Sequence, residues 1–106
     1  MNIRIMIIAL MMMQSLVSLA QLGGQEYKFR GLEFLDEGQS DSAMVYLNQA
    51  VIKGLADGEV LGGLALAYFQ KGDAARALEN AVEARKDLIH PSADAYLAGV
   101  LAYEEL

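Results

Sequence analysis

The sequence predicts an all-α fold, a right-handed stack of antiparallel helix hairpins with about five helices after an N-terminal segment. Three observations support this prediction. Marker residues recur at an interval of 34 residues, so that Gly31, Phe34, Gly38, Ala43, Leu47 and Ala50 correspond to Ala65, Tyr68, Gly72, Ala77, Ala81 and Ala84. The small residues in these sets stand where two antiparallel helices would touch, and glycine separates the helical stripes. A fixed period of this length is typical of stacked helical repeats.

Composition limits both the domain count and the chemistry. A length of 106 residues allows one domain at most. The absence of cysteine excludes a disulfide framework, a thiolate zinc site and a cysteine nucleophile. The net charge is -6 and no basic cluster occurs, which excludes a nucleic-acid partner, because affinity for phosphates depends on lysine and arginine.

Residues 1–20 are typical of a secretory signal peptide. Arg4 provides the positive start, an unbroken apolar stretch covers residues 5–13, and small residues precede a cleavage site after Ala20. The predicted location is therefore secreted or periplasmic. The alternative is an uncleaved anchor, because residues 3–22 are long enough to span a bilayer, and membrane association is expected only in that case.

Five helical segments follow a flexible joint at residues 21–25. Apolar spacing and the intervening breaks place the helices at about residues 26–37, 41–53, 59–70, 74–87 and 92–106. Ser40 or Asp41 is expected to cap the second helix, Asp57 the third and Asp73 the fourth, since their side-chain oxygens can accept a bond from a free backbone N–H. The helix ends are expected at Gly38, Gly54 and Gly72, and residues 90–92, with Pro91, are expected to form the break before the last helix.

These markers resemble the tetratricopeptide repeat. The second repeat supplies its pattern with Leu61, Leu64, Ala65, Tyr68, Ala77, Ala81 and Ala84, and the first with Tyr27, Gly31, Phe34, Ala43, Leu47 and Ala50. The first repeat departs from the pattern at Arg30, where leucine is usual. The resemblance covers residues 26–106, with repeats at 26–57 and 58–91 and a half repeat or capping helix at 92–106. The Sel1-like repeat is the related alternative, and the short interval between each turn glycine and the following alanine favours the tetratricopeptide type.

No catalytic or metal-binding constellation can be assembled from these residues. His90 is the only histidine and adjoins Pro91 in a predicted turn, which is typical of an exposed loop residue. A nucleophilic triad needs a base beside the nucleophile, and a metal site needs clustered ligands. We therefore expect no enzyme activity, no cofactor and no metal.

The resemblance implies a protein-binding groove on the concave side, lined by the first helix of each pair. The corresponding positions are Lys28, Leu32, Leu35, Gly62, Leu66, Phe69, Tyr96, Val100 and Tyr103. This lining is mostly apolar, and Lys28 alone matches the basic clamp that the family uses for acidic peptide tails, so an apolar helical or extended peptide is expected. The alternative is that Leu32, Leu66 and Val100 simply pack against neighbouring helices.

The last predicted helix carries few polar residues. They are Ser92, Asp94, Glu104 and Glu105, which make residues 92–106 a poor solvated end for a repeat array. This pattern indicates either a homodimer formed through residues 92–106 or the opening part of a longer repeat protein. The predicted function is an exported, non-catalytic module that binds a protein or peptide; the alternative is a self-associating or membrane-anchored scaffold.

Overall fold

The structure is a computed structural model that describes residues 2–8 and 23–106. Residues 3–8 are helical. The helices that follow are α2 (Gly24–Asp36), α3 (Ser40–Ile52), α4 (Gly58–Gln70), α5 (Ala74–Arg85) and α6 (Ala93–Glu105). No strand occurs in the described ranges, so the predicted all-α class is confirmed.

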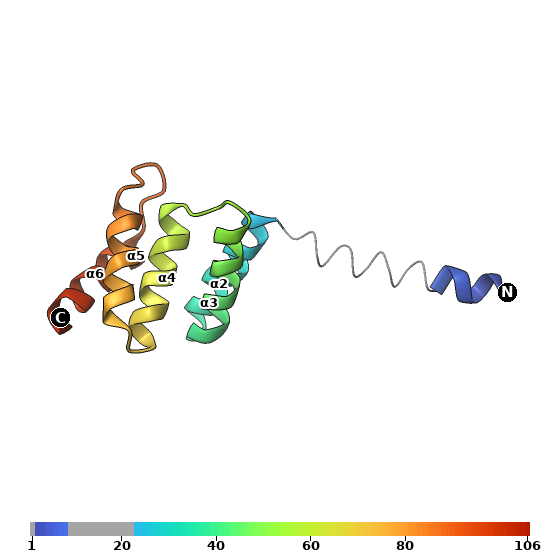
Figure 1. Ribbon diagram of the computed structural model, residues 1–106, viewed down its shortest axis with the longest axis horizontal. Helices are drawn as coiled ribbons and strands as arrows, with labels where there is room; N and C mark the ends of the chain where they lie inside the picture. Colours follow the sequence, from blue (N-terminus) through green and yellow to red (C-terminus); the bar gives the residue numbers. More distant parts are fainter. Residues whose placement is uncertain (1, 9–22) are drawn as a thin grey trace.

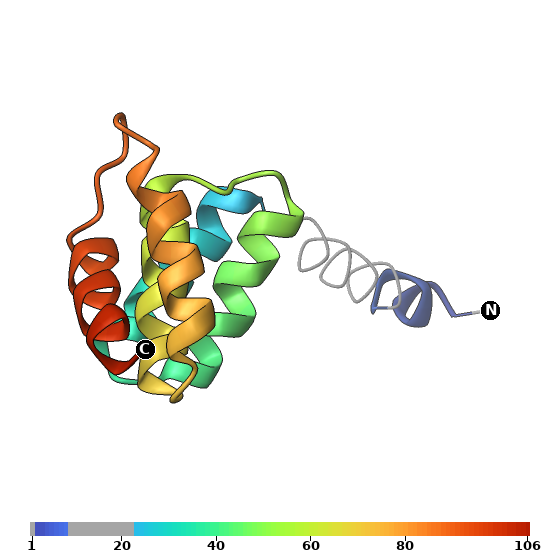
Figure 2. The same ribbon diagram turned by 60° about the vertical axis from the view of Figure 1, so that its left-hand side comes forward.

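The helices form a stack of antiparallel hairpins. Helices α2 and α3 make the first hairpin, α4 and α5 make the second, and α6 packs against both members of the second. The first hairpin and α6 lie at opposite ends of the stack, with the second hairpin between them (Figure 1). Figure 2 shows α5 and α6 side by side at the C-terminal end. The predicted arrangement of stacked hairpins is confirmed.

Glycine ends three of the helices, as predicted. Gly38, Gly54 and Gly72 have φ angles of 77°, 88° and 87°, a backbone conformation that residues with a side chain rarely adopt. After α2, the N–H of Gly38 donates to the carbonyl of Leu35 at 3.0 Å and that of Gln39 to Phe34 at 2.9 Å. The same pair of bonds follows α3 and α4, so each of these glycines satisfies the last carbonyls of its helix.

Three helices also have the expected kind of cap at their first residues. The side-chain oxygens of Asp57, Asp73 and Ser92 accept from the N–H groups of Val60, Arg76 and Ala95 at 2.9, 3.1 and 3.2 Å. Each bond satisfies a backbone donor that the helix itself leaves free. The predicted caps at Asp57 and Asp73 are confirmed.

The predicted cap of α3 is wrong. Gln39 occupies the capping position without a side-chain bond, and neither Ser40 nor Asp41 caps the helix. The Ser40 hydroxyl instead bonds to the Gln70 side chain, and the Asp41 carboxylate lies 2.7 Å from Lys71 Nζ. Both side chains therefore connect the turn of the first hairpin to the turn of the second.

Two helix boundaries differ by two residues from the predicted ones, and the others agree within one. Helix α2 begins at Gly24, inside the expected joint, because Gly24 lies against Leu55 in the link between the hairpins. Helix α5 ends at Arg85 rather than at Asp87, whose carboxylate accepts bonds from the following loop.

The core changes in character along the stack. Large aliphatic residues fill the contact between the first hairpin and α4, around the fully buried Leu47. The contacts of α6 are formed by alanines instead, namely Ala65, Ala81 and Ala98 in one cluster and Ala74, Ala77 and Ala102 in another. Small side chains let helix backbones approach closely, so α6 lies deep between α4 and α5 and buries its alanine face.

None of the helices in residues 2–8 and 23–106 combines the length and the apolar character that crossing a bilayer requires. Most of the predicted signal, including the cleavage site after Ala20, lies outside the described residues. Cleavage and export therefore stay predictions.

Candidate protein-binding surface

Two of the predicted groove residues are buried inside the stack. Lys28 and Leu35 are each 6% exposed. The Lys28 Nζ lies 2.7 Å from the Asp57 carboxylate and 3.4 Å from Glu59, while Leu35 belongs to the aliphatic core. The stacking of the second hairpin on the first covers both positions. Lys28 therefore ties α2 to the start of α4 and does not line an open surface.

The surroundings of Lys28 keep both members of this buried pair charged. Burial lowers the pKa of Lys28, but the hydrogen bond and charge of Asp57, followed by Glu59, raise it above its usual value. Burial raises the pKa of Asp57, but the bonds from Lys28 and from the Val60 N–H hold it below its usual value. The opposite shifts are those expected of a matched ion pair.

Three further predicted residues are half-buried. Helix α4 covers Leu32, and α6 covers Leu66 and Phe69. Leu32 and Leu66 pack against the aliphatic core, and Phe69 packs against the alanine cluster at α6. Gly62 beside them is buried, and a side chain there would collide with Ser92. The structure thus assigns Leu32 and Leu66 the packing role that was the alternative to peptide binding.

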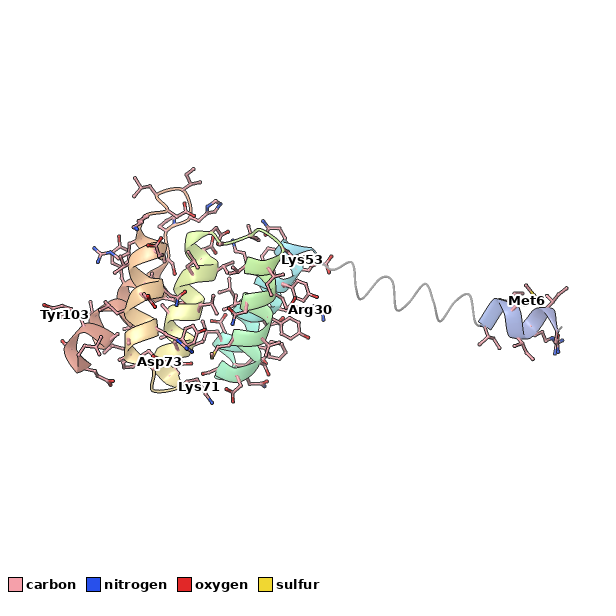
Figure 3. All side chains as sticks on the ribbon, viewed as in Figure 1. Met6, Arg30, Lys53, Lys71, Asp73 and Tyr103 are labelled. Atoms are coloured by element: carbon pink, nitrogen blue, oxygen red, sulfur yellow. The ribbon has the colours of Figure 1, made fainter. Side chains whose placement is uncertain are left out.

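The last three predicted residues remain open. Tyr96, Val100 and Tyr103 on α6 are 55%, 59% and 74% exposed. Figure 3 shows Tyr103 projecting from the C-terminal end of the stack. Val100 is not among the residues packed against the core clusters, in contrast to Leu32 and Leu66.

A groove of about 280 Å³ runs between α5 and α6 at this end. Its walls and floor consist of Leu78, Ala81, Val82 and Arg85 from α5 and Tyr96, Gly99, Val100, Tyr103 and Glu104 from α6. Gly99 and Ala81 meet at the floor, where a Cβ on Gly99 would come within 3.3 Å of the Ala81 side chain. We call this feature the α5–α6 groove.

The α5 residues of this groove are not among those predicted from the sequence. The signal that could have identified them is the 34-residue period, which relates Leu78, Val82 and Arg85 to Met44, Asn48 and Val51 of α3. Those three earlier residues are half-buried, whereas Val82 and Arg85 are exposed. Tyr96, Val100 and Tyr103 of α6 are likewise exposed, whereas the corresponding residues of α4 are buried or half-buried. The corresponding surface between α3 and α4 is thus covered by other helices of the stack, whereas the α5–α6 groove is exposed.

The two ends of the α5–α6 groove carry opposite charges. The Arg85 guanidinium lies 4.9 Å from the centre of the Tyr96 ring, at the start of α6. Glu104 lies eight positions further along the same helix, which corresponds to about 12 Å. The groove therefore has a basic end, an apolar middle and an acidic end.

A carboxylate network holds the loop that leads into α6. Asp87 accepts bonds from the N–H groups of Gly58, Ile89 and His90 at 2.7, 3.0 and 3.1 Å, and its side chain lies 3.0 Å from His90 Nδ1. The bond from Gly58, with those from His90 and Ile89, lowers the pKa of Asp87 to about 2 despite some desolvation. His90, predicted as a free loop residue, is half-exposed and helps to fix this loop.

This network makes the stability of the protein depend on pH. The pKa of Asp87 is lowered from 3.8 to about 2 on folding, so its contribution is present above pH 3.8 and is lost as the pH falls through 2. We expect the free energy of unfolding to decrease over this range, and Asp87→Asn to weaken that decrease. Urea unfolding followed by circular dichroism at several pH values would measure both. Equal pH dependence in the two proteins would show that the Asp87 bonds do not form.

Comparison with known proteins found relatives in Escherichia coli. A stretch of 62 residues, or 57% of the chain, is 42% identical to the "Putative cellulose synthase operon protein C" of strain O157:H7 and to the "Cellulose synthase operon protein C" of strain K12. The chain spans only 5% of the length of each of these relatives. No family model matches the chain, and no solved structure does. The stacked hairpins, with this partial similarity, support in coarse terms a tetratricopeptide-like helical array.

Proposed function

We propose that this chain is an exported, non-catalytic protein-binding module whose binding surface is the α5–α6 groove. The observation that carries the proposal is the exposure of Tyr96, Val100 and Tyr103, at 55%, 59% and 74%, on a helix whose other face is closely packed. Clustered exposed apolar and aromatic side chains mark interaction sites on protein surfaces.

The shape of the groove favours a protein partner over a small molecule. Its volume of about 280 Å³ lies at the low end for ligand pockets, which are roughly 300–1,000 Å³. It lacks a set of convergent polar groups, because its only charged side chains, Arg85 and Glu104, stand at opposite ends. A long apolar trough between two helices suits an amphipathic helix that inserts its apolar face.

Site-specific crosslinking in the producing cell tests the binding surface. A photoreactive amino acid in place of Tyr103 should yield discrete adducts, because this side chain projects from the groove. The matched control replaces Val45, which is 61% exposed on α3 and lies outside the groove. Adducts of equal yield from both positions, or from neither, would contradict the proposal.

Export rests on the sequence of residues 1–20 and has a separate test. The intact mass of the chain recovered from the producing cell should correspond to a protein that begins at Gln21. A full-length chain in the membrane fraction would indicate the retained anchor instead. A full-length chain in the cytosol would show that export does not occur.

A further inference from the structure

We infer that the occupant of the α5–α6 groove is the same groove of a second copy of this chain. The two α6 helices then lie antiparallel across a twofold axis near Val100. The inference rests on the proposed function, because it too requires the groove to bind a protein. It adds the identity of that protein.

The surface shape of the groove is complementary to itself. Its floor is made of the small residues Ala81 and Gly99, and its rim carries the large, exposed residues Val100 and Tyr103. Two such surfaces facing each other can place the rim residues of one copy over the floor of the other. A twofold interface requires this property, because the same patch serves both copies.

The charges select the antiparallel arrangement. Val100 lies midway between Tyr96 and Glu104 in the sequence, so an antiparallel pair centred on Val100 places Tyr96 of one copy opposite Glu104 of the other. Arg85 stacks on Tyr96, 4.9 Å from the ring centre, and therefore faces that Glu104. Opposite charges meet at both ends of the interface, whereas a parallel arrangement would bring like charges together.

The opposite end of the stack is more strongly charged than the α5–α6 groove. The α2 residues Glu26, Arg30 and Glu33 precede Val60, Leu64 and Ala67 by 34 residues, and those three are the buried α4 residues that join the aliphatic core. Glu26, Arg30 and Glu33 are exposed, so the outer face of α2 carries charged side chains where α4 carries apolar ones. Arg30 and Tyr103 lie at opposite ends of the stack (Figure 3). The charged residues of α2 therefore do not match the apolar middle of the α5–α6 groove.

Light scattering after size exclusion tests the pairing on the processed chain. The mass should be twice that of the single chain, and Val100→Glu should yield a monomer of unchanged helicity, because it brings two carboxylates together at the axis. The control is Val45→Glu, since Val45 and Val100 are 61% and 59% exposed, and it should remain dimeric. A monomer throughout the concentration range, or a dimer that survives Val100→Glu, would overturn the inference.

A charge exchange tests the antiparallel geometry. Arg85→Glu and Glu104→Arg should each weaken the dimer, on the order of tenfold, because each creates a like-charge contact at both ends. An equimolar mixture of the two variants should form a heterodimer, since the acidic groove of one variant then faces the basic groove of the other. Arg76→Glu is the matched control for α5: Arg76 also stacks on a tyrosine, 5.9 Å from the Tyr68 ring, but lies outside the groove.

The outcomes separate this inference from the proposed function. If the mixture of single variants does not associate, the antiparallel twofold pairing is wrong. If the chain is a monomer but position 103 crosslinks to a different protein in the cell, the inference fails and the proposed binding surface stands. If the chain is a monomer and position 103 forms no adduct, both fail.

Discussion

Lys28→Met is expected to lower the free energy of unfolding by about 3 kcal/mol, because it leaves the Asp57 carboxylate buried without its partner. The side chains of Lys28 and Asp57 are 8% and 7% exposed and lie 2.7 Å apart. Methionine retains the apolar stem of the lysine, so the loss measures the charge and its hydrogen bonds. Urea unfolding followed by circular dichroism would give the value.

Two further variants make this experiment decisive. Lys53→Met alters an exposed lysine and should change stability by less than about 0.5 kcal/mol. Adding Asp57→Ser to Lys28→Met removes the stranded charge while serine can still accept the Val60 N–H, so the double variant should be more stable than Lys28→Met alone. If Lys28→Met left stability unchanged, the Lys28–Asp57 pair would not contribute to folding as the structure implies.

Leu47→Ala is expected to lower the free energy of unfolding by about 3 kcal/mol, since it opens a cavity at a fully buried position. Leu47 lies against Gly31, where an added Cβ would come within 2.6 Å of Leu47 Cγ, and it also contacts the Gly63 position. Gly31→Ala should therefore destabilise the protein as well, in this case by overpacking. Urea unfolding would measure each variant.

The combination of these two changes should cost less than the sum of the single ones. The methyl group added at position 31 occupies part of the space that the leucine leaves. The second repeat already has this pair, because Ala65 and Ala81 stand 34 residues after Gly31 and Leu47 and are 0% and 1% exposed. Strict additivity would show that the two side chains do not share one packing site.

The period and the helix ends could be predicted because their causes are local. Gly38 and Gly72 end helices by a backbone conformation that needs no partner elsewhere, and Asp57 and Asp73 cap the helices that directly follow them. Ser40 and Asp41 have equally suitable side chains for capping, yet they bind Gln70 and Lys71 of the next hairpin. A competing contact that is distant in sequence cannot be read from the capping pattern itself.

The candidate site could be predicted only in part, and for a related reason. Alignment to the repeat identifies Leu35, Phe69 and Tyr103 as equivalent positions, although the first is buried, the second half-buried and the third exposed. What distinguishes them is how far the other helices of residues 23–106 cover each position. Whether Val82 and Arg85 of α5 line the groove depends in addition on how α6 packs against α5.

The sequence by itself determined the helices, their 34-residue repetition and the apolar character of the last helix, because these follow from side-chain spacing and local backbone preference. Only the tertiary structure decided which of the repeated positions meet solvent. Alanine contacts draw α6 close to α4 and α5, so its alanine face is buried and Tyr96, Val100 and Tyr103 remain open beside Arg85. Burial depends on neighbours from distant parts of the chain, and packing between helices sets them.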